Sequence, residues 1–163
     1  MARVAIVLGS GSDRPVYREA AGVLEELGVD HERRIISAHR TPDLLREYVT
    51  RAQEAGTRVF IAVAGMSAAL PGVIASHTVL PVIGVPVASS SPVLGLDALL
   101  SMVQMPPGIP VATVAMNGGR NAALLAVQIL AAGDRELEGR LRGHREAMRE
   151  KVLRQDGELR SEP

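Results

Sequence analysis

The amino-acid sequence predicts an α/β fold: a single domain with a three-layer, doubly wound parallel sheet. Short apolar runs alternate along the chain with segments whose apolar residues recur at helical spacing. This alternation is typical of parallel strands joined by right-handed helical crossovers. The chain has 163 residues and is 47% hydrophobic, which suffices for one core. We expect the domain to span residues 1–156, including a C-terminal helix, and residues 157–163 to form a flexible tail.

Five strands are predicted in chain order. The first, Val4 to Leu8, is continuously apolar, as expected of a strand buried on both faces. The other four lie at residues 31–36, 59–63, 82–85 and 111–115.

Six helices are predicted between and after these strands. The first begins at Arg14-Pro15 and the second at Pro42, and Gly28 and Gly56 supply their expected ends. A third, rich in small residues, ends at about Thr78. The remaining three lie at residues 96–103, 121–132 and 134–154.

Composition excludes several classes of function. Cysteine is absent, which rules out disulfides and thiolate chemistry and favours a cytoplasmic location. The net charge is zero, which argues against binding a nucleic acid or a membrane surface through bulk charge. Tyr17, Tyr48 and Phe60 are the only aromatic residues, too few to stack single-stranded bases. The first strand begins almost at Met1, and no stretch is long enough to span a membrane, so we expect neither a signal peptide nor a membrane anchor.

The first strand leads directly into Gly9-Ser10-Gly11-Ser12-Asp13. The glycines permit a sharp turn and a close approach to a ligand, and the free amides of the following helix favour an anion. Asp13 opposes an anion but could accept hydrogen bonds from sugar hydroxyls. A simpler interpretation is that Ser12 or Asp13 only caps the helix. The loop is neither a P-loop, because Gly-Lys-Ser/Thr is absent, nor Gly-x-Gly-x-x-Gly, because position 14 is arginine.

The second strand leads into Ser37-Ala38-His39-Arg40-Thr41-Pro42. Thr41 is a suitable N-cap, so His39 and Arg40 stand where a strand passes into a helix. Histidine can transfer a proton near neutral pH, and arginine offers a planar set of donors to phosphate or carboxylate. The alternative is a solvated turn without a ligand.

The third strand is followed by Gly65, Met66 and Ser67. With the central strand order 2-1-3 of flavodoxin-like or Rossmann-like sheets, all three loops meet at the topological switch point. One pocket would then contain Ser10, Ser12, Asp13, His39 and Arg40 together with the amides of residues 65–67. This set suits a phosphorylated sugar or a nucleotide. It includes neither a metal-ligand cluster nor a nucleophile–base–orienter triad.

Several motifs in the chain resemble those of the PurE family, the purine-biosynthesis enzymes that make carboxyaminoimidazole ribonucleotide. The motifs stand in family order and with family spacing over about residues 3–155. They are Gly-Ser-Gly-Ser-Asp at 9–13, Ser-Ala-His-Arg-Thr-Pro at 37–42, Leu-Pro-Val-Ile-Gly-Val-Pro at 80–86, Ser-Met-Val-Gln-Met-Pro at 101–106, Gly-Ile-Pro-Val at 108–111 and Asn-Ala-Ala-Leu-Leu-Ala at 121–126.

The resemblance implies a homo-octameric enzyme that acts on an aminoimidazole ribonucleotide without ATP, metal or biotin. The mutase branch moves CO2 from the exocyclic nitrogen of N5-carboxyaminoimidazole ribonucleotide to ring carbon C4. The carboxylase branch adds free CO2 to aminoimidazole ribonucleotide. Carried over by motif, His39 is the proton carrier. The substrate-binding positions are Ser10, Asp13 and Arg40, with Ser12, Ser37, Ala38, Gly65 and Ser67 beside them.

The segment after the third strand departs from the family pattern. Mutases usually have Gly-Gly-Ala-Ala-His-Leu-Pro-Gly there, and Ala69 replaces that histidine. Ser67 followed by Ala69-Leu70 resembles the carboxylase branch, whereas Arg40, Leu-Pro-Gly and Val-Gln-Met-Pro resemble the mutase branch. We predict a mutase. The carboxylase, and a non-catalytic module that binds a nucleotide or a phosphosugar, are the alternatives.

Two further groups of residues carry expectations. The helix at 121–132 is apolar on nearly every face, so part of it should contact other subunits. The charged helix after it should reach over a neighbour. The loop at 89–94, or the helix that follows it, should approach a neighbour's pocket. Ser89-Ser90-Ser91 is either a flexible loop or, as the family resemblance favours, part of a pocket wall. His31 and His144 are predicted to be solvated, and His77 to end a helix.

Overall fold

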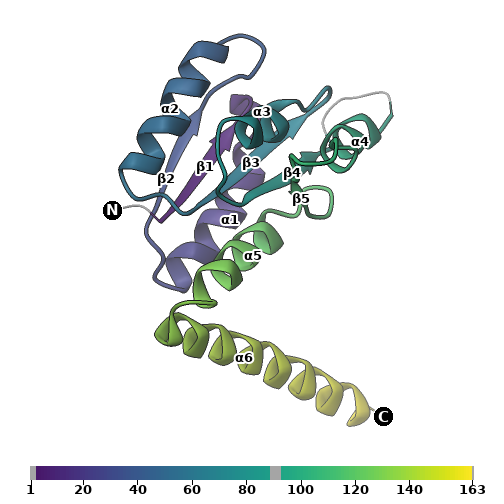
Figure 1. The fold of residues 1–163 in the computed structure, drawn as a ribbon. Coiled ribbons are helices and arrows are strands. Elements are labelled where there is room, and N and C mark those ends of the chain that lie inside the picture. The colour runs from purple at the N-terminus through teal and green to yellow at the C-terminus, as the bar shows by residue number, and fades with distance from the viewer. Residues whose placement is uncertain (1–2, 89–92, 163) are drawn as a thin grey trace.

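The computed structural model describes residues 3–88 and 93–162. Five parallel strands form one sheet in the order β2-β1-β3-β4-β5, with helices on both faces (Figure 1). The predicted α/β fold and single domain are confirmed. The strands are β1 (Val4–Leu8), β2 (His31–Ile35), β3 (Val59–Gly65), β4 (Val82–Val87) and β5 (Ala112–Thr113). The α-helices are α1 (Arg14–Glu26), α2 (Pro42–Glu54), α3 (Leu70–Ser76), α4 (Leu96–Val103), α5 (Gly119–Ala131) and α6 (Arg135–Arg160).

The core consists of two apolar clusters, one on each face of the sheet. On one face, side chains of α1 and α5 pack against alternate residues of β1, β3 and β4, as Val23 and Ala126 illustrate. On the other face, α2, α3 and α4 pack against the intervening residues, as Leu45, Ile74 and Met102 illustrate. Every residue of β1 is buried, because this strand lies between β2 and β3 and is covered on both faces.

Several element boundaries differ from the predictions. β3 and β4 each continue two residues further, to Gly65 and Val87, whereas β5 is reduced to Ala112–Thr113. The last helix, α6, continues to Arg160, so its predicted end near residue 154 is wrong and most of the expected flexible tail is helical. Two ion pairs between residues four apart favour the helical conformation there: Glu150 with Arg154 and Asp156 with Arg160.

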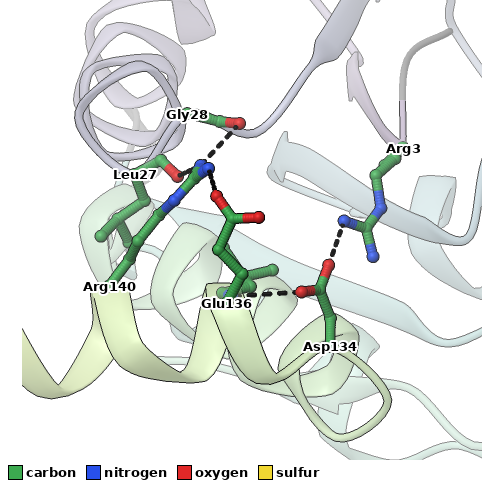
Figure 2. A network of polar contacts seen from close by, with 7 residues as sticks. Arg3, Leu27, Gly28, Asp134, Glu136 and Arg140 are labelled. Carbon is green, nitrogen blue, oxygen red and sulfur yellow. Dashed lines mark hydrogen bonds and ion pairs between the residues drawn. The ribbon is translucent and has the colours of Figure 1, made fainter.

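The beginning of α6 is fixed to α1 and β1 by charged side chains (Figure 2). Arg140 donates from Nη1 to the carbonyl oxygen of Leu27, at 2.9 Å, and so satisfies the C-terminal end of α1. Asp134 caps α6 by accepting from the amide of Leu137 and also pairs with Arg3 at 2.9 Å. Beyond this anchored end, α6 projects away from the sheet (Figure 1).

The histidines outside the loops differ in their surroundings. His144 was predicted to be solvated, but only 8% of its side chain is exposed, and its Nδ1 lies 2.8 Å from Glu26 Oε1. His31 is half-buried, with Nδ1 3.3 Å from the carbonyl oxygen of Val29. Both predictions are wrong because α6 and the sheet edge cover positions whose sequence neighbours are charged. His77 follows α3 as its C-cap residue and is exposed, as expected of a histidine at a helix end.

Helix α5 is apolar both on its buried face and on part of its accessible face, as its composition predicts. Its residues Ala122, Ala123, Ala126 and Val127 are fully buried. Leu124, Leu125 and Ile129 pack against the core and remain partly accessible. Contact of this helix with another subunit stays a prediction. Over residues 3–88 and 93–162, no helix combines the length and apolarity needed to cross a membrane.

Candidate active site

The loops after β1, β2 and β3 meet at the carboxyl ends of these adjacent strands and enclose a cavity of about 650 Å³. The cavity is lined by all the residues that the sequence singled out for a site: Ser10, Ser12, Asp13, Ser37, Ala38, His39, Arg40, Gly65 and Ser67. The structure thus brings these residues together at the predicted edge of the sheet. Their individual roles stay predictions.

The first loop is a compact polar turn. Ser10 caps a short 3-10 turn (Gly11–Asp13), and its Oγ accepts hydrogen bonds from the amide and the hydroxyl of Ser12. In return, the amide of Ser10 donates to Asp13 Oδ2 at 3.0 Å, which completes a capping box. The Asp13 side chain therefore bonds within this turn and does not cap α1, although Asp13 occupies the N-cap position of α1. The same residues of this loop thus cap the turn and line the cavity, where they can contact a ligand.

Asp13 is only 4% exposed, and no arginine, lysine or histidine is paired with it among the described residues. Burial raises the pKa of this carboxyl above its ordinary value of 3.8, against the opposing effect of hydrogen bonds from Ser10 and Ser12. An aspartate side chain with few protein partners is a hydrogen-bond acceptor of the kind that ribose hydroxyls require.

The raised pKa of Asp13 predicts a pH-dependent effect on stability. The raised pKa means that the folded state binds the proton of the Asp13 carboxyl more tightly than the unfolded state does. The protonated Asp13 side chain therefore contributes to the free energy of unfolding below pH 3.8, and this contribution is lost as the pH rises through the raised pKa. We expect Asp13→Asn to increase the free energy of unfolding at pH 7, since asparagine keeps an acceptor for the Ser10 amide without the buried charge. Urea unfolding at pH 7 and pH 4 measures this, with a smaller gain expected at pH 4. An equal gain at both pH values would contradict it.

The second loop is held by Ser37 and Thr41, which leave His39 at the surface of the cavity. Thr41 stands at the N-cap of α2, but its hydroxyl does not cap that helix. Instead its Oγ1 accepts from the Ser37 amide at 3.1 Å and donates to the Ser37 carbonyl oxygen at 3.0 Å. His39 is exposed, and neither of its ring nitrogens bonds to another residue among those described. Both nitrogens are therefore available to a substrate.

Arg40 connects the second loop to the first. Its Nε donates to Ser37 Oγ at 3.3 Å, and its Nη2 donates to the carbonyl oxygen of Gly9, also at 3.3 Å. The guanidinium is thus oriented toward the serine-rich turn while most of its donors remain free. Arg40 and the hydroxyls of the first loop form a surface suited to an anion such as phosphate.

The third loop and its flanks supply lining residues whose side chains the sequence did not assign to the site: Ala64, Met66, Ala68, Ala69 and Leu70. Gly9 was missed as well, although it stands at the end of β1. One signal could have found them, because residues at and just after the carboxyl ends of neighbouring parallel strands reach the same edge of the sheet. The loop at 89–94, expected near a neighbour's pocket, lies outside the described residues except for Val93 and Leu94. No group of three or more His, Asp or Glu side chains in the described chain is placed to hold a metal ion.

Comparison with known proteins defines the family. The sequence model of the AIR carboxylase family matches residues 3–151. The chain belongs to this family. It is 55% identical to a Pyrococcus abyssi protein named N5-carboxyaminoimidazole ribonucleotide mutase, over 91% of the chain and 85% of that protein. The mutase of the same name from Escherichia coli is 52% identical, over 93% of the chain and 90% of that protein. The crystal structure of Treponema denticola PurE superposes with a TM-score of 0.88 at 30% identity and covers 96% of the chain and 97% of that structure.

A relative with the carboxylase name is also similar. The chloroplastic phosphoribosylaminoimidazole carboxylase of Vigna aconitifolia is 52% identical over 94% of the chain, but the match covers only 27% of that protein. The carboxylase name therefore belongs to a polypeptide much longer than this chain, whereas the mutases match over most of both lengths.

Proposed function

We propose that this protein is an N5-carboxyaminoimidazole ribonucleotide mutase of purine biosynthesis. The observation that carries the proposal is the cavity at the carboxyl ends of β1, β2 and β3. There a histidine with no partner among residues 3–88 and 93–162, an arginine held by two hydrogen bonds and a buried aspartate line one space. The chain is about half identical to proteins of that name. His39 is the proposed acid and base, and no metal or organic cofactor enters the proposal.

The binding step follows from the polar half of the cavity. The substrate phosphate accepts hydrogen bonds from the Arg40 guanidinium and the Ser10 hydroxyl, with Ser12 and Ser37 beside them. The ribose hydroxyls donate to the buried Asp13 carboxylate. Contacts at these two non-reacting groups hold the imidazole ring in one position relative to His39 and the third loop.

The chemical step needs one proton carrier used twice. Protonated His39 donates a proton to the exocyclic nitrogen and the nitrogen–carboxyl bond breaks. Aminoimidazole ribonucleotide, with its amino group and ring uncharged, and CO2 then remain in the cavity. The electron-rich C4 then attacks CO2 and forms the new carbon–carbon bond. His39, now neutral, removes the proton from C4, which restores the aromatic ring and returns His39 to its starting state. No proton is gained or lost overall.

One alternative has an observation in its favour. Ala69 stands where mutases usually have histidine, and the plant carboxylase is as similar in sequence as several mutases. The direct test incubates the purified protein with N5-carboxyaminoimidazole ribonucleotide, or with aminoimidazole ribonucleotide and bicarbonate, and follows formation of the 4-carboxy product. Rapid conversion of the first and slow conversion of the second supports the mutase. The reverse result identifies a carboxylase, and binding without either reaction identifies a non-catalytic module.

Anchoring of the phosphate gives a kinetic prediction. We expect Arg40→Ala and Ser10→Ala to raise KM more than they lower kcat, because they remove contacts to a group that does not react. Steady-state kinetics on each variant measures this. Arg46→Ala is the matched control, because Arg46 lies on α2, just after the Arg40 loop, and outside the cavity; it should leave both constants unchanged. A wild-type KM in Arg40→Ala would place the phosphate elsewhere.

The assembly is proposed to be a cytoplasmic homo-octamer with active sites near subunit interfaces. Apolar residues along the projecting part of α6 support contact with another copy, because Met148, Val152 and Leu159 are all more than half exposed in the single chain. Light scattering at micromolar concentration is expected to give about eight times the chain mass of 17.2 kDa. A monomeric mass would contradict the assembly.

A further inference from the structure

The cavity has two chemically different halves. The first and second loops supply its hydroxyl, carboxyl, imidazole and guanidinium groups. The third loop, between β3 and α3, supplies mainly aliphatic side chains and contains no titratable side chain. Ser67 is its one polar side chain, beside Ala64, Met66, Ala68, Ala69 and Leu70.

Met66 stands out within this apolar half. Its φ is +56°, in the left-handed region that residues with a Cβ rarely adopt. Leu94 and Asn117 are the other described non-glycine residues with positive φ, and neither lines the cavity. Met66 is also 59% exposed, so it lies at the open side of the cavity that it lines.

The surrounding loop explains how this conformation is maintained. The carbonyl oxygen of Met66 accepts a hydrogen bond from the Ala68 amide at 2.7 Å, and that of Ser67 accepts one from the Ala69 amide at 2.6 Å. Ala68 and Leu70 are each only 2% exposed, so burial of these two residues fixes the turn. Met66 is therefore held in an unfavourable conformation by its neighbours and gains no burial of its own. Strain of this kind is concentrated at functional sites.

We propose that Met66 keeps water out of the apolar half of the cavity during the interval in which CO2 is free, and so determines how much of the CO2 is recaptured. The inference rests on the proposed function. Free CO2 is uncharged and apolar, so the aliphatic third loop is the part of the cavity that favours it over water. A thioether on an unbranched, flexible chain can cover a small ligand closely and still move to admit substrate. Met66 acts on retention of CO2 and not on proton transfer.

The test compares Met66→Ala and Met66→Gly with the matched control Met66→Leu in the full-length assembly. Unlabelled N5-carboxyaminoimidazole ribonucleotide is converted in buffer containing ¹³C-bicarbonate, and mass spectrometry measures the ¹³C in the product carboxyl group against an enzyme-free blank. Water entry lets bound CO2 exchange with the solution. We therefore expect the labelled fraction to rise about fivefold in the alanine and glycine variants and to stay within about twofold of wild type in the leucine variant.

Two further measurements distinguish this role from a structural one. KM should change little in all three variants, because Met66 is not among the residues proposed to hold the phosphate or the ribose, and light scattering should give the wild-type mass. A labelled fraction that is unchanged in Met66→Ala and Met66→Gly would overturn the proposal, as would an equal rise in Met66→Leu or a change in mass without a change in label. If the wild-type protein does not convert the substrate, the proposed function fails, and this inference fails with it.

Discussion

Replacing His39 by asparagine is expected to abolish turnover while leaving substrate binding and folding intact. A missing general acid–base group lowers rates by about 10²–10⁴-fold, and His39 serves both proton transfers in the proposed mechanism, so the loss should reach at least the upper end of that range. Asparagine retains a polar side chain of similar size but cannot carry the proton. His39 is exposed and bonds to no other described residue, so its replacement removes no contact from the core.

The measurements for His39→Asn are kcat with N5-carboxyaminoimidazole ribonucleotide and the Kd of the 4-carboxy product by calorimetry. His77→Asn is the matched control, because His77 is also exposed but stands at the end of α3, outside the cavity. This control should retain wild-type kcat. Activity of His39→Asn within about threefold of wild type would remove His39 from the proton transfers.

Replacing Gly119 by alanine is expected to cause the largest loss of stability. Gly119 is the first residue of α5, and a Cβ there would lie 2.2 Å from the carbonyl oxygen of Val16 in α1. No side-chain rotation relieves this clash, since the obstructing atom belongs to the backbone, so α1 and α5 must separate. We expect a loss of about 3 kcal/mol, because forced overpacking of a core typically costs 1–3 kcal/mol and sometimes more.

Thermal and urea unfolding measure the effect of Gly119→Ala. For a chain of this size, about 3 kcal/mol corresponds to a decrease in Tm of about 6–12 °C. Gly139→Ala and Gly143→Ala are matched controls, because these glycines lie within α6 and a Cβ there would meet nothing within 4 Å. Each control should gain about 0.5–1 kcal/mol from better helix propensity. A Gly119→Ala protein as stable as wild type would show that the two helices can separate without cost.

The sequence by itself determined most of the fold and the position of the site. The strand Val4–Leu8 and the helix Leu96–Val103 were predicted to the residue, because hydrophobic periodicity and local turn residues are properties of neighbouring positions. The same local signals placed His39 and Arg40 in one loop and Ser10 and Asp13 in another. The rule that loops after adjacent parallel strands share one edge then brought the two loops together.

The tertiary structure alone decided what these residues can do. Burial of Asp13, the hydrogen bond from Arg40 to Gly9 and the close approach of Gly119 to Val16 all join positions that local patterns treat separately. Burial of His144 against Glu26 likewise depends on the direction that Arg140 gives to α6. The left-handed backbone of Met66 arises because its neighbours in the turn are buried. Each of these features depends on the packing of separate elements against one another, and the pattern of apolar and polar residues along one segment carries no record of that packing.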